Sequence, residues 1–393
     1  MSFGIAYDRT GTANFWEGEA GPPLEYVPAA YYGNLSTFAS AGGYIGPSII
    51  TTALSTLKVP STYNYSLGIQ RSLGFSTMID VSYVANLSRH LEINRPINNI
   101  PAFSEFNPAN ADPTNTSKPV PDNFFRPYLG YSSITSYEDS GSSNYNSMQV
   151  SLRRQFKKGL QYGASYTWSR LMGYTTPSSY YSTWRARTYG PVSYDRRQTL
   201  VFNWVYELPK FSANLGSAGR YLHPVIDDWN LSGIATFTTG APFTPTLTTS
   251  PTVNFTGSSD AARPNVIGNP VLPKSQRTLY EAFNVSAFAE PTPCSSTNQT
   301  LACFGNLGYD SLYGPGIDNW DISVEKRIPV GLGELRTLNL RAEFYNAFNH
   351  PQFNALNSTL QYNAAGAQIN AAAGQYTATR DPRIIALNLR LRF

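Results

Sequence analysis

Few residues of this chain have the types and spacing that metal or covalent chemistry needs. The residues able to ligate zinc are two cysteines and three histidines, namely Cys294, Cys303, His90, His223 and His350. A structural zinc site needs four such ligands close together, and no histidine lies near either cysteine in the sequence. Asp227 and Asp228 precede Trp229 and are expected in a solvated turn rather than a metal site. We therefore expect no catalytic, metal or cofactor site, and the chain is not expected to be an enzyme.

The two cysteines are the pair best suited to covalent chemistry. Eight residues lie between Cys294 and Cys303, in a stretch rich in Pro, Ser, Thr and Asn. Such a pair forms a loop disulfide in an oxidising compartment, and the alternative is two unpaired thiols. We expect the disulfide.

Charge and composition exclude several classes of protein. The 393 residues include 29 Lys and Arg against 25 Asp and Glu, so the net charge is +4. That charge is too small, and the arginines are too dispersed, for a surface that follows nucleic-acid phosphates. The 6 Trp, 27 Tyr and 21 Phe argue against a disordered chain. Residues 1–8 do not look like a secretory signal, and no apolar run could form a spanning helix, so any membrane crossing is expected to use a β-barrel.

Long amphipathic strands are the elements that would position these residues. Between 160 and 169, apolar residues alternate with small or polar ones: Leu160, Tyr162, Ala164, Tyr166 and Trp168 share one face. The same alternation recurs at 63–71, 75–83, 148–156, 200–208, 320–328, 338–344 and 385–393. A soluble sandwich also alternates, but its strands average five or six residues. Strands of about ten to thirteen residues, tilted by about 40°, are long enough to cross the hydrocarbon of an outer membrane.

The alternating segments predict ten crossings joined by short and long connections in turn. They are about 3–9, 63–72, 75–84, 144–156, 160–172, 195–207, 229–239, 318–328, 336–348 and 383–393, with 129–139 treated as extracellular structure inside a loop 85–143. Short periplasmic turns, long extracellular loops and an even strand number are typical of outer-membrane barrels. Aromatic residues near strand ends, such as Trp204 and Trp320, fit an interfacial girdle, although ordinary strand enrichment in aromatics is the alternative. The expected fold class is all-β, an antiparallel transmembrane β-barrel with long extracellular loops and a periplasmic C-terminus.

Charged residues on two polar strand faces are expected to point into the lumen. They are Glu325, Arg327, Arg341 and Glu343. Charges there would keep the wall of a channel hydrated, or would contact a plug domain. Residues 195–197 could form an ion-pair cluster at the extracellular mouth of a strand, and loop 240–317 is long enough to cover that mouth. Because long ordered loops usually carry function, this loop is the expected place of ligand contact, without particular residues assigned.

The last strand alternates to the end of the given sequence. Leu389, Leu391 and Phe393 share its apolar face, and the final residue is aromatic. Such a strand is similar to the signal read by the machinery that inserts outer-membrane barrels. The alternative is an ordinary amphipathic strand that happens to end in Phe.

Several segments resemble the C-terminal barrel of TonB-dependent receptors. They are 145–152, 160–169, 194–198, 313–321 and 341–353, and the last is the most specific. The match is best to the Oar-like group, whose members carry a carboxypeptidase-regulatory-like N-terminal domain, and it covers nearly the whole chain in the family's order. The resemblance implies a cell outer-membrane location and the C-terminal portion of a 22-stranded barrel, with outer-membrane lipid, the insertion machinery and TonB as partners.

Relatives of this kind carry a signal peptide, a TonB-contacting box, a plug and about a dozen further strands, none of which is expected within residues 1–393. The leading hypothesis is therefore one barrel portion, 1–393, of a receptor for a bulky nutrient that does not transport alone. The substrate stays open. An autonomous small pore or adhesin and a secreted soluble all-β binding module are the alternatives.

Overall fold

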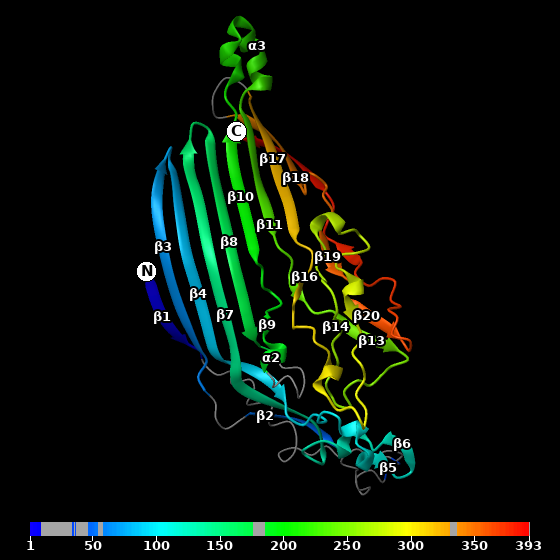
Figure 1. Cartoon of the computed structure of the whole chain (residues 1–393). Helices are drawn as coiled ribbons and strands as arrows, with labels where there is room; N and C mark the ends of the chain where they lie inside the picture. Colours follow the sequence, from blue (N-terminus) through cyan, green and yellow to red (C-terminus); the bar gives the residue numbers. More distant parts are fainter. Residues whose placement is uncertain are drawn as a thin grey trace.

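Ten strands form one curved antiparallel sheet (Figure 1) in the computed structural model, which describes residues 1–8, 34, 36, 46–53, 58–175, 185–330 and 336–392. In sheet order they are β1 (Ser2–Tyr7), β3 (Ser61–Gly74), β4 (Thr77–Pro96), β7 (Tyr131–Lys157), β8 (Leu160–Tyr174), β10 (Gln198–Glu207), β11 (Trp229–Thr238), β17 (Ile317–Pro329), β18 (Thr337–Tyr345) and β22 (Ile384–Arg392). The ten predicted strands and the all-β antiparallel fold class are confirmed.

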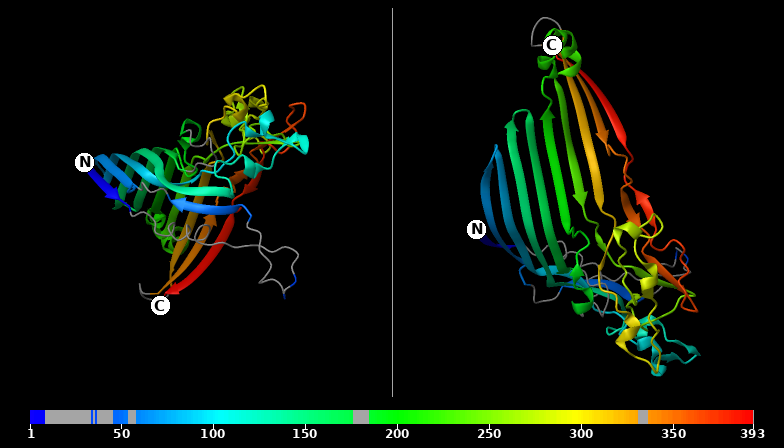
Figure 2. Two further views of the ribbon diagram at one scale, coloured as in Figure 1. Left: turned by 90° about the horizontal axis from the view of Figure 1, so that it is seen from below. Right: turned by 45° about the horizontal axis from the view of Figure 1, so that its top comes forward.

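The sheet is open. Among the described strands, β1 pairs with β3 and β22 pairs with β18, and the two edge strands do not pair with each other. Figure 2 shows the two termini at separate edges of the curved sheet. Two short strands join off this path: β2 (Ser48–Ala53) runs parallel to β7, and β9 (Gly190–Pro191) pairs with β8. These ten strands therefore form a wall rather than a closed ring.

The β4–β7 pair is longer than predicted. Its register runs from Thr77 opposite Arg154 to Pro96 opposite Thr135. Residues 131–139 therefore belong to β7. The loop between the two strands is 97–130, rather than the predicted 85–143. Burial stabilises the extension, because the side chain of Ile93 is 2% exposed and Arg95 forms an ion pair with Glu138. The register also shifts twice near His90, whose φ of 56° marks a bulge that interrupts the alternation.

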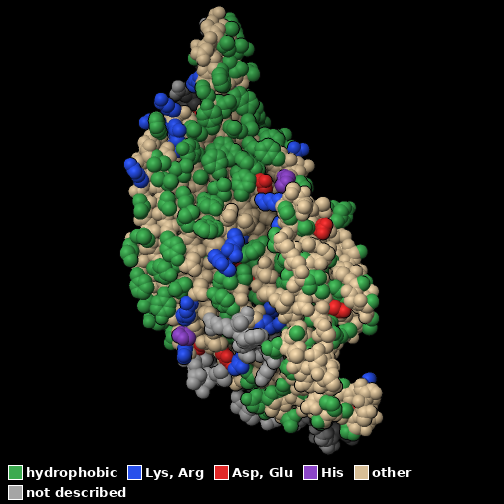
Figure 3. Space-filling model, viewed as in Figure 1, with side chains coloured by type: hydrophobic (Ala, Val, Ile, Leu, Met, Phe, Trp, Pro, Cys, Tyr) green, Lys and Arg blue, Asp and Glu red, His purple; other side chains and the backbone are tan. Residues whose placement is uncertain are grey.

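One face of the sheet is apolar across its width. Ile69, Val81, Val150, Tyr166 and Leu200 lie opposite one another on five successive strands, and Ile69 is 73% exposed. Figure 3 shows hydrophobic side chains spread over the strands on this side of the molecule. The neighbouring row on the other face is polar, with Gln70, Asp80, Ser151 and Ser165 in register. The predicted alternation is confirmed, and it separates a lipid-compatible face from a water-compatible one.

A helical segment lies on the β10–β11 connection, at the end of the sheet with the short turns (Figure 1). It consists of η6 (Phe211–Asn214) and α3 (Gly216–Ile226), which the alternation did not predict. Within the described part of the chain, no helix has the length and apolar character needed to cross a membrane.

The prediction of a solvated turn at 227–228 is wrong for Asp227, which is 3% exposed and accepts a 3.0 Å hydrogen bond from the Ser212 backbone N–H. Lys326 lies on the apolar face and is 4% exposed. Its Nζ donates to the Asp227 carbonyl oxygen and lies 5.6 Å from the centre of the Trp229 ring. The ammonium group is thus held at the end of the sheet, where burial on the apolar face costs least.

Segments 97–130, 240–316 and 346–383 pack together at the other end of the sheet, and we call them the loop assembly. Their strands are β5 (Ala111–Asp112), β6 (Asn115–Pro119), β12 (Pro242–Phe243), β13 (Thr246–Ser250), β14 (Asn265–Val266), β15 (Phe288–Ala289), β16 (Leu312–Tyr313), β19 (Phe353–Leu356), β20 (Thr359–Asn363) and β21 (Tyr376–Thr379). Parallel pairing of β13 with β20 joins two of the segments, and Leu312 and Leu360 meet in one buried cluster. A 2.9 Å hydrogen bond from the Phe103 backbone N–H to the Thr256 carbonyl oxygen joins segment 97–130 to segment 240–316.

Candidate functional site

The four charges predicted for the lumen lie together on the polar face. Glu325 is opposite Arg341, and Arg327 is opposite Asn339. Arg341 Nη2 lies 2.8 Å from Glu343 Oε1, and Arg341 Nε donates a 2.9 Å hydrogen bond to Ser323 Oγ. Arg341 and Glu343 line a groove of about 440 Å³ that also contacts Gln161, Asn203 and Asp321. The face therefore carries both signs of charge and several neutral hydrogen-bonding groups, which suits contact with water, a plug or a polar solute.

The ion-pair cluster predicted at 195–197 connects the mouth of a strand to the loop assembly. Asp195 is 2% exposed, and its Oδ1 accepts a 2.8 Å hydrogen bond from Leu171 N–H. Arg197 Nε lies 3.4 Å from Asp195 Oδ2 and donates to the Tyr313 hydroxyl at 2.7 Å. Burial raises the pKa of Tyr313, while the guanidinium of Arg197 acts in the opposite direction. The three side chains form a polar latch between β10 and the segment that leads into β17.

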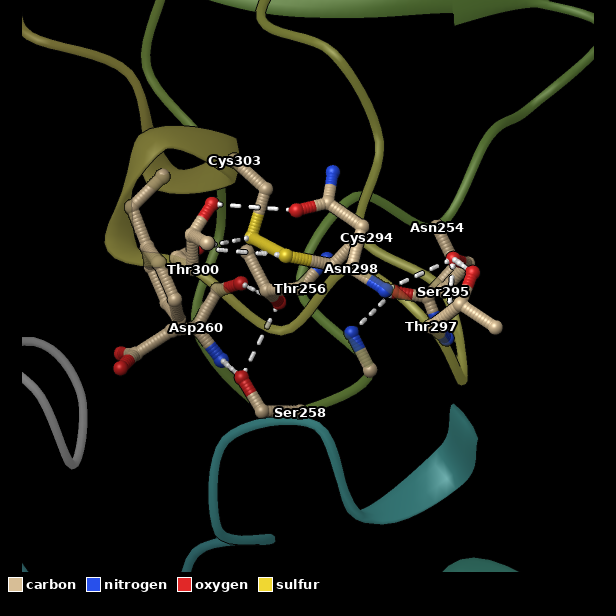
Figure 4. The surroundings of a disulfide bond; sticks show 12 residues. Asn254, Thr256, Ser258, Asp260, Cys294, Ser295, Thr297, Asn298, Thr300 and Cys303 are labelled. Carbon is tan, nitrogen blue, oxygen red and sulfur yellow. Dashed lines mark hydrogen bonds between the residues drawn. A yellow bond between two sulfur atoms is a disulfide. The ribbon is translucent and has the colours of Figure 1, made fainter. Parts of the chain in front are cut away.

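Cys294 and Cys303 form a disulfide within segment 240–316 (Figure 4), with a Cα–Cα distance of 5.5 Å. Both are buried and pack against Phe304, whose ring meets that of Phe103 edge-on at 6.0 Å. Around the bond, polar side chains hydrogen-bond to the turns of the loop, for example Thr256 Oγ1 to Asp260 O at 2.6 Å. The disulfide thus lies in the contact between segments 97–130 and 240–316, and the structure assigns it a position in the fold rather than at an open cleft.

A pair of half-buried arginines was missed by the sequence analysis. Arg187, in α2 (Arg185–Thr188), donates to Phe304 O at 2.8 Å and Gly305 O at 3.2 Å. Arg263 Nη1 donates to Arg187 O at 2.8 Å. Burial lowers the pKa of Arg187 to about 10, and the nearby Arg263 adds to this effect. No sequence signal could have found them, because they lie 76 positions apart in irregular segments.

The C-terminal strand carries Leu389 and Leu391 on the apolar face, where they are 66% and 55% exposed. Phe393, the third residue of the predicted insertion signal, lies outside the described residues. In the described ranges, no three His, Cys, Asp or Glu side chains are grouped so that they could hold a metal ion.

Solved structures similar to this chain are outer-membrane transporters. The outer membrane transporter YddB from Escherichia coli is 10% identical, with a TM-score of 0.42, over 89% of this chain and 35% of that one. The ferric-catecholate import receptor Fiu from E. coli K12 is 10% identical, with a TM-score of 0.38, over 99% and 32%. The FrpB iron transporter from Neisseria meningitidis is 10% identical, with a TM-score of 0.38, over 86% and 32%. The chain spans about a third of the length of these transporters.

Sequence comparisons give the family. No curated protein matches the chain. A family model described as an outer membrane beta barrel domain matches residues 2–386, which is nearly the whole chain. The match covers nine strands of the sheet and the first three residues of β22. The chain therefore belongs to the outer membrane beta barrel domain family, and its place is the cell outer membrane.

Proposed function

We propose that this chain forms part of the wall of a TonB-dependent receptor of the Oar-like group, which takes up a bulky nutrient. The observation that carries the proposal is the open sheet with one polar face. Ten strands about 4.8 Å apart span about 43 Å from the first strand to the last, and the two edge strands, β1 and β22, do not pair with each other. Since barrel diameter grows with strand number, such a wall suits a wide lumen and a large solute.

The polar face and the loop assembly support the same function. Arg341, Glu343 and Asp321 would present both charges to a solute or plug inside the lumen. The loop assembly, joined by β13–β20 pairing, would form an ordered ligand-contacting surface above it. An autonomous adhesin is the second candidate, because the packed and disulfide-linked loops would also suit surface recognition.

Energised uptake tests the proposal. The natural gene product would be expressed in hosts with and without TonB, and accumulation of labelled ferric siderophores and oligosaccharides would be measured. We expect at least one probe to accumulate only when TonB is present. Equal accumulation in both hosts would indicate a passive pore, and surface adherence without uptake would indicate an adhesin.

Residues 1–393 alone are expected not to support uptake. Unpaired backbone groups along the β1 and β22 edges would be costly in lipid, at several kcal/mol each, so the wall needs further strands or a partner to close it. The test is to express these residues behind a secretory signal in a receptor-deficient host. TonB-dependent accumulation above the empty-vector level would overturn this part of the proposal.

A further inference from the structure

A groove lies where the loop assembly meets the apolar face of the sheet. Its volume is about 840 Å³. Its floor includes Tyr166, Leu200, Phe237 and Asp318, which form one cross-strand row on β8, β10, β11 and β17. These positions are on the lipid-compatible face, close to the ends of β10 and β11 that lead into the loops. The groove therefore faces the membrane side of the wall rather than the polar side.

Basic side chains form part of the other wall of this groove. Lys274 and Arg277 come from segment 240–316, and Arg197 comes from the mouth of β10. Arg197 is already held by Asp195 and Tyr313. Along the described part of the chain, no carboxylate lies within salt-bridge distance of Lys274 or Arg277. Figure 3 shows Lys and Arg side chains along the boundary between the hydrophobic surface and the loops.

The remaining charges do not cancel this excess. Among the described residues, Asp318 is the one carboxylate that lines the groove, and its Oδ1 accepts a 3.2 Å hydrogen bond from Trp320 Nε1. Arg277 Nε donates to Leu272 O at 3.0 Å, and its other guanidinium nitrogens have no described partner. Lys274 is exposed. The groove thus has two available cations above an aromatic and aliphatic floor.

The arrangement identifies the chemistry of an occupant. In the outer membrane the floor row faces acyl chains, and the cations lie at the end of the strands that leads into the loop assembly, at headgroup height. A ligand that satisfies both parts must carry acyl chains and an anionic head on the same molecule. Guanidinium and ammonium groups bind phosphate strongly. We propose that this groove binds a phosphorylated lipid of the outer leaflet through Lys274 and Arg277.

Lipid binding tests this site separately from transport. The natural gene product would be reconstituted in nanodiscs of phosphatidylcholine doped with bisphosphorylated lipid A, monophosphorylated lipid A or the dephosphorylated glycolipid. Bound lipid per protein would be measured by mass spectrometry after delipidation and rebinding. We expect affinity to fall in that order. For Lys274→Gln combined with Arg277→Gln, we expect a loss of about 10- to 30-fold for the bisphosphorylated lipid, because each of the two cations near an anionic surface strengthens binding by about three- to fivefold.

Two controls separate the site from general charge and from misfolding. Lys118→Gln removes an exposed cation on β6 that does not line the groove, and it should leave binding unchanged. Arg277→Lys keeps the charge and should retain most of the binding. Equal binding of the dephosphorylated glycolipid, or an equal loss with Lys118→Gln, would overturn the proposal. Competition by inorganic phosphate as effective as that by lipid A would also overturn it, because it would show an anion site without acyl recognition. Unchanged binding by the double variant would do the same.

Discussion

Placing an arginine at Ala164 tests the assignment of the two sheet faces. Ala164 lies on the apolar face of β8, opposite Leu152 and Phe202. The next residue, Ser165, lies on the polar face opposite Ser151 and Val201, so neither neighbour would repel an introduced arginine. Ala164→Arg and Ser165→Arg therefore add the same side chain at nearly the same depth, on opposite faces. Ala164→Leu controls for the added volume.

The expected cost follows from the depth of Ala164. It lies four residues beyond Leu160, where β8 begins at its turn. At about 3.3 Å per residue and a tilt of about 40°, Ala164 lies about 10 Å from this strand end along the membrane normal. Half of a hydrocarbon band about 25 Å thick is about 12 Å, so Ala164 lies near the midplane, where an arginine costs about 2–4 kcal/mol. Ser165→Arg should cost under about 1 kcal/mol, because its side chain stays in water.

A guanidinium titration of the natural gene product folded into lipid vesicles would measure these differences as free energies of unfolding. A cost of about 2–4 kcal/mol shifts the folding equilibrium by about 30- to 900-fold, well outside the error of the extrapolation. Equal costs for the two arginine variants would refute the assignment of faces. A cost for Ala164→Leu as large as that for Ala164→Arg would show that volume, and not charge in lipid, causes the effect.

Three further predictions concern the loop assembly and the latch. Cys294 and Cys303 should resist maleimide on intact, unreduced cells, and opening their short ring should cost about 2–3 kcal/mol in the chain-entropy model; labelling of both thiols would disprove the bridge. Burial raises the pKa of Tyr362 to about 12. The stability that the neutral Tyr362 hydroxyl contributes is complete below pH 10 and is lost as the pH rises through about 12. Tyr362→Phe should therefore flatten a curve of unfolding free energy against alkaline pH. Asp195→Asn leaves Arg197 without its carboxylate and should cost about 1–3 kcal/mol, measured by thermal melting in detergent; an unchanged midpoint would contradict the latch.

The strands could be predicted from the sequence because their signal is local. A strand that separates lipid from water must alternate at every position, so the pattern at 160–169 alone indicates the two faces of β8. Pairing between neighbours in the chain then follows from short turns such as 157–159, where Lys158 and Gly159 both have positive φ. The boundaries of β4 and β7 were harder to predict, because the register shifts near His90, beyond the membrane, and the alternation of apolar and polar residues stops there.

The loop assembly could not be predicted, because its contacts join residues far apart in the sequence. Thr246 lies opposite Thr359 in the β13–β20 pair, and no periodicity in either short segment indicates the other. The same holds for Arg187 and Arg263, whose guanidinium groups donate to backbone carbonyls and lie over the rings of Phe304 and Tyr309, in turns far away in the sequence. Helix α3 was missed for a different reason: eleven residues with glycines and an internal proline have little helical signal of their own.

The parallel pairing of β13 with β20 has a consequence for how this surface can change. Each strand comes from a different loop, and β17 and β18 lie between them in the chain. Replacing one loop by a foreign sequence would leave the other with an unpaired edge and an uncovered Leu360. Surface variation by recombination would then have to exchange residues 240–383 as one block, including two wall strands, whereas single-loop grafts would be selected against.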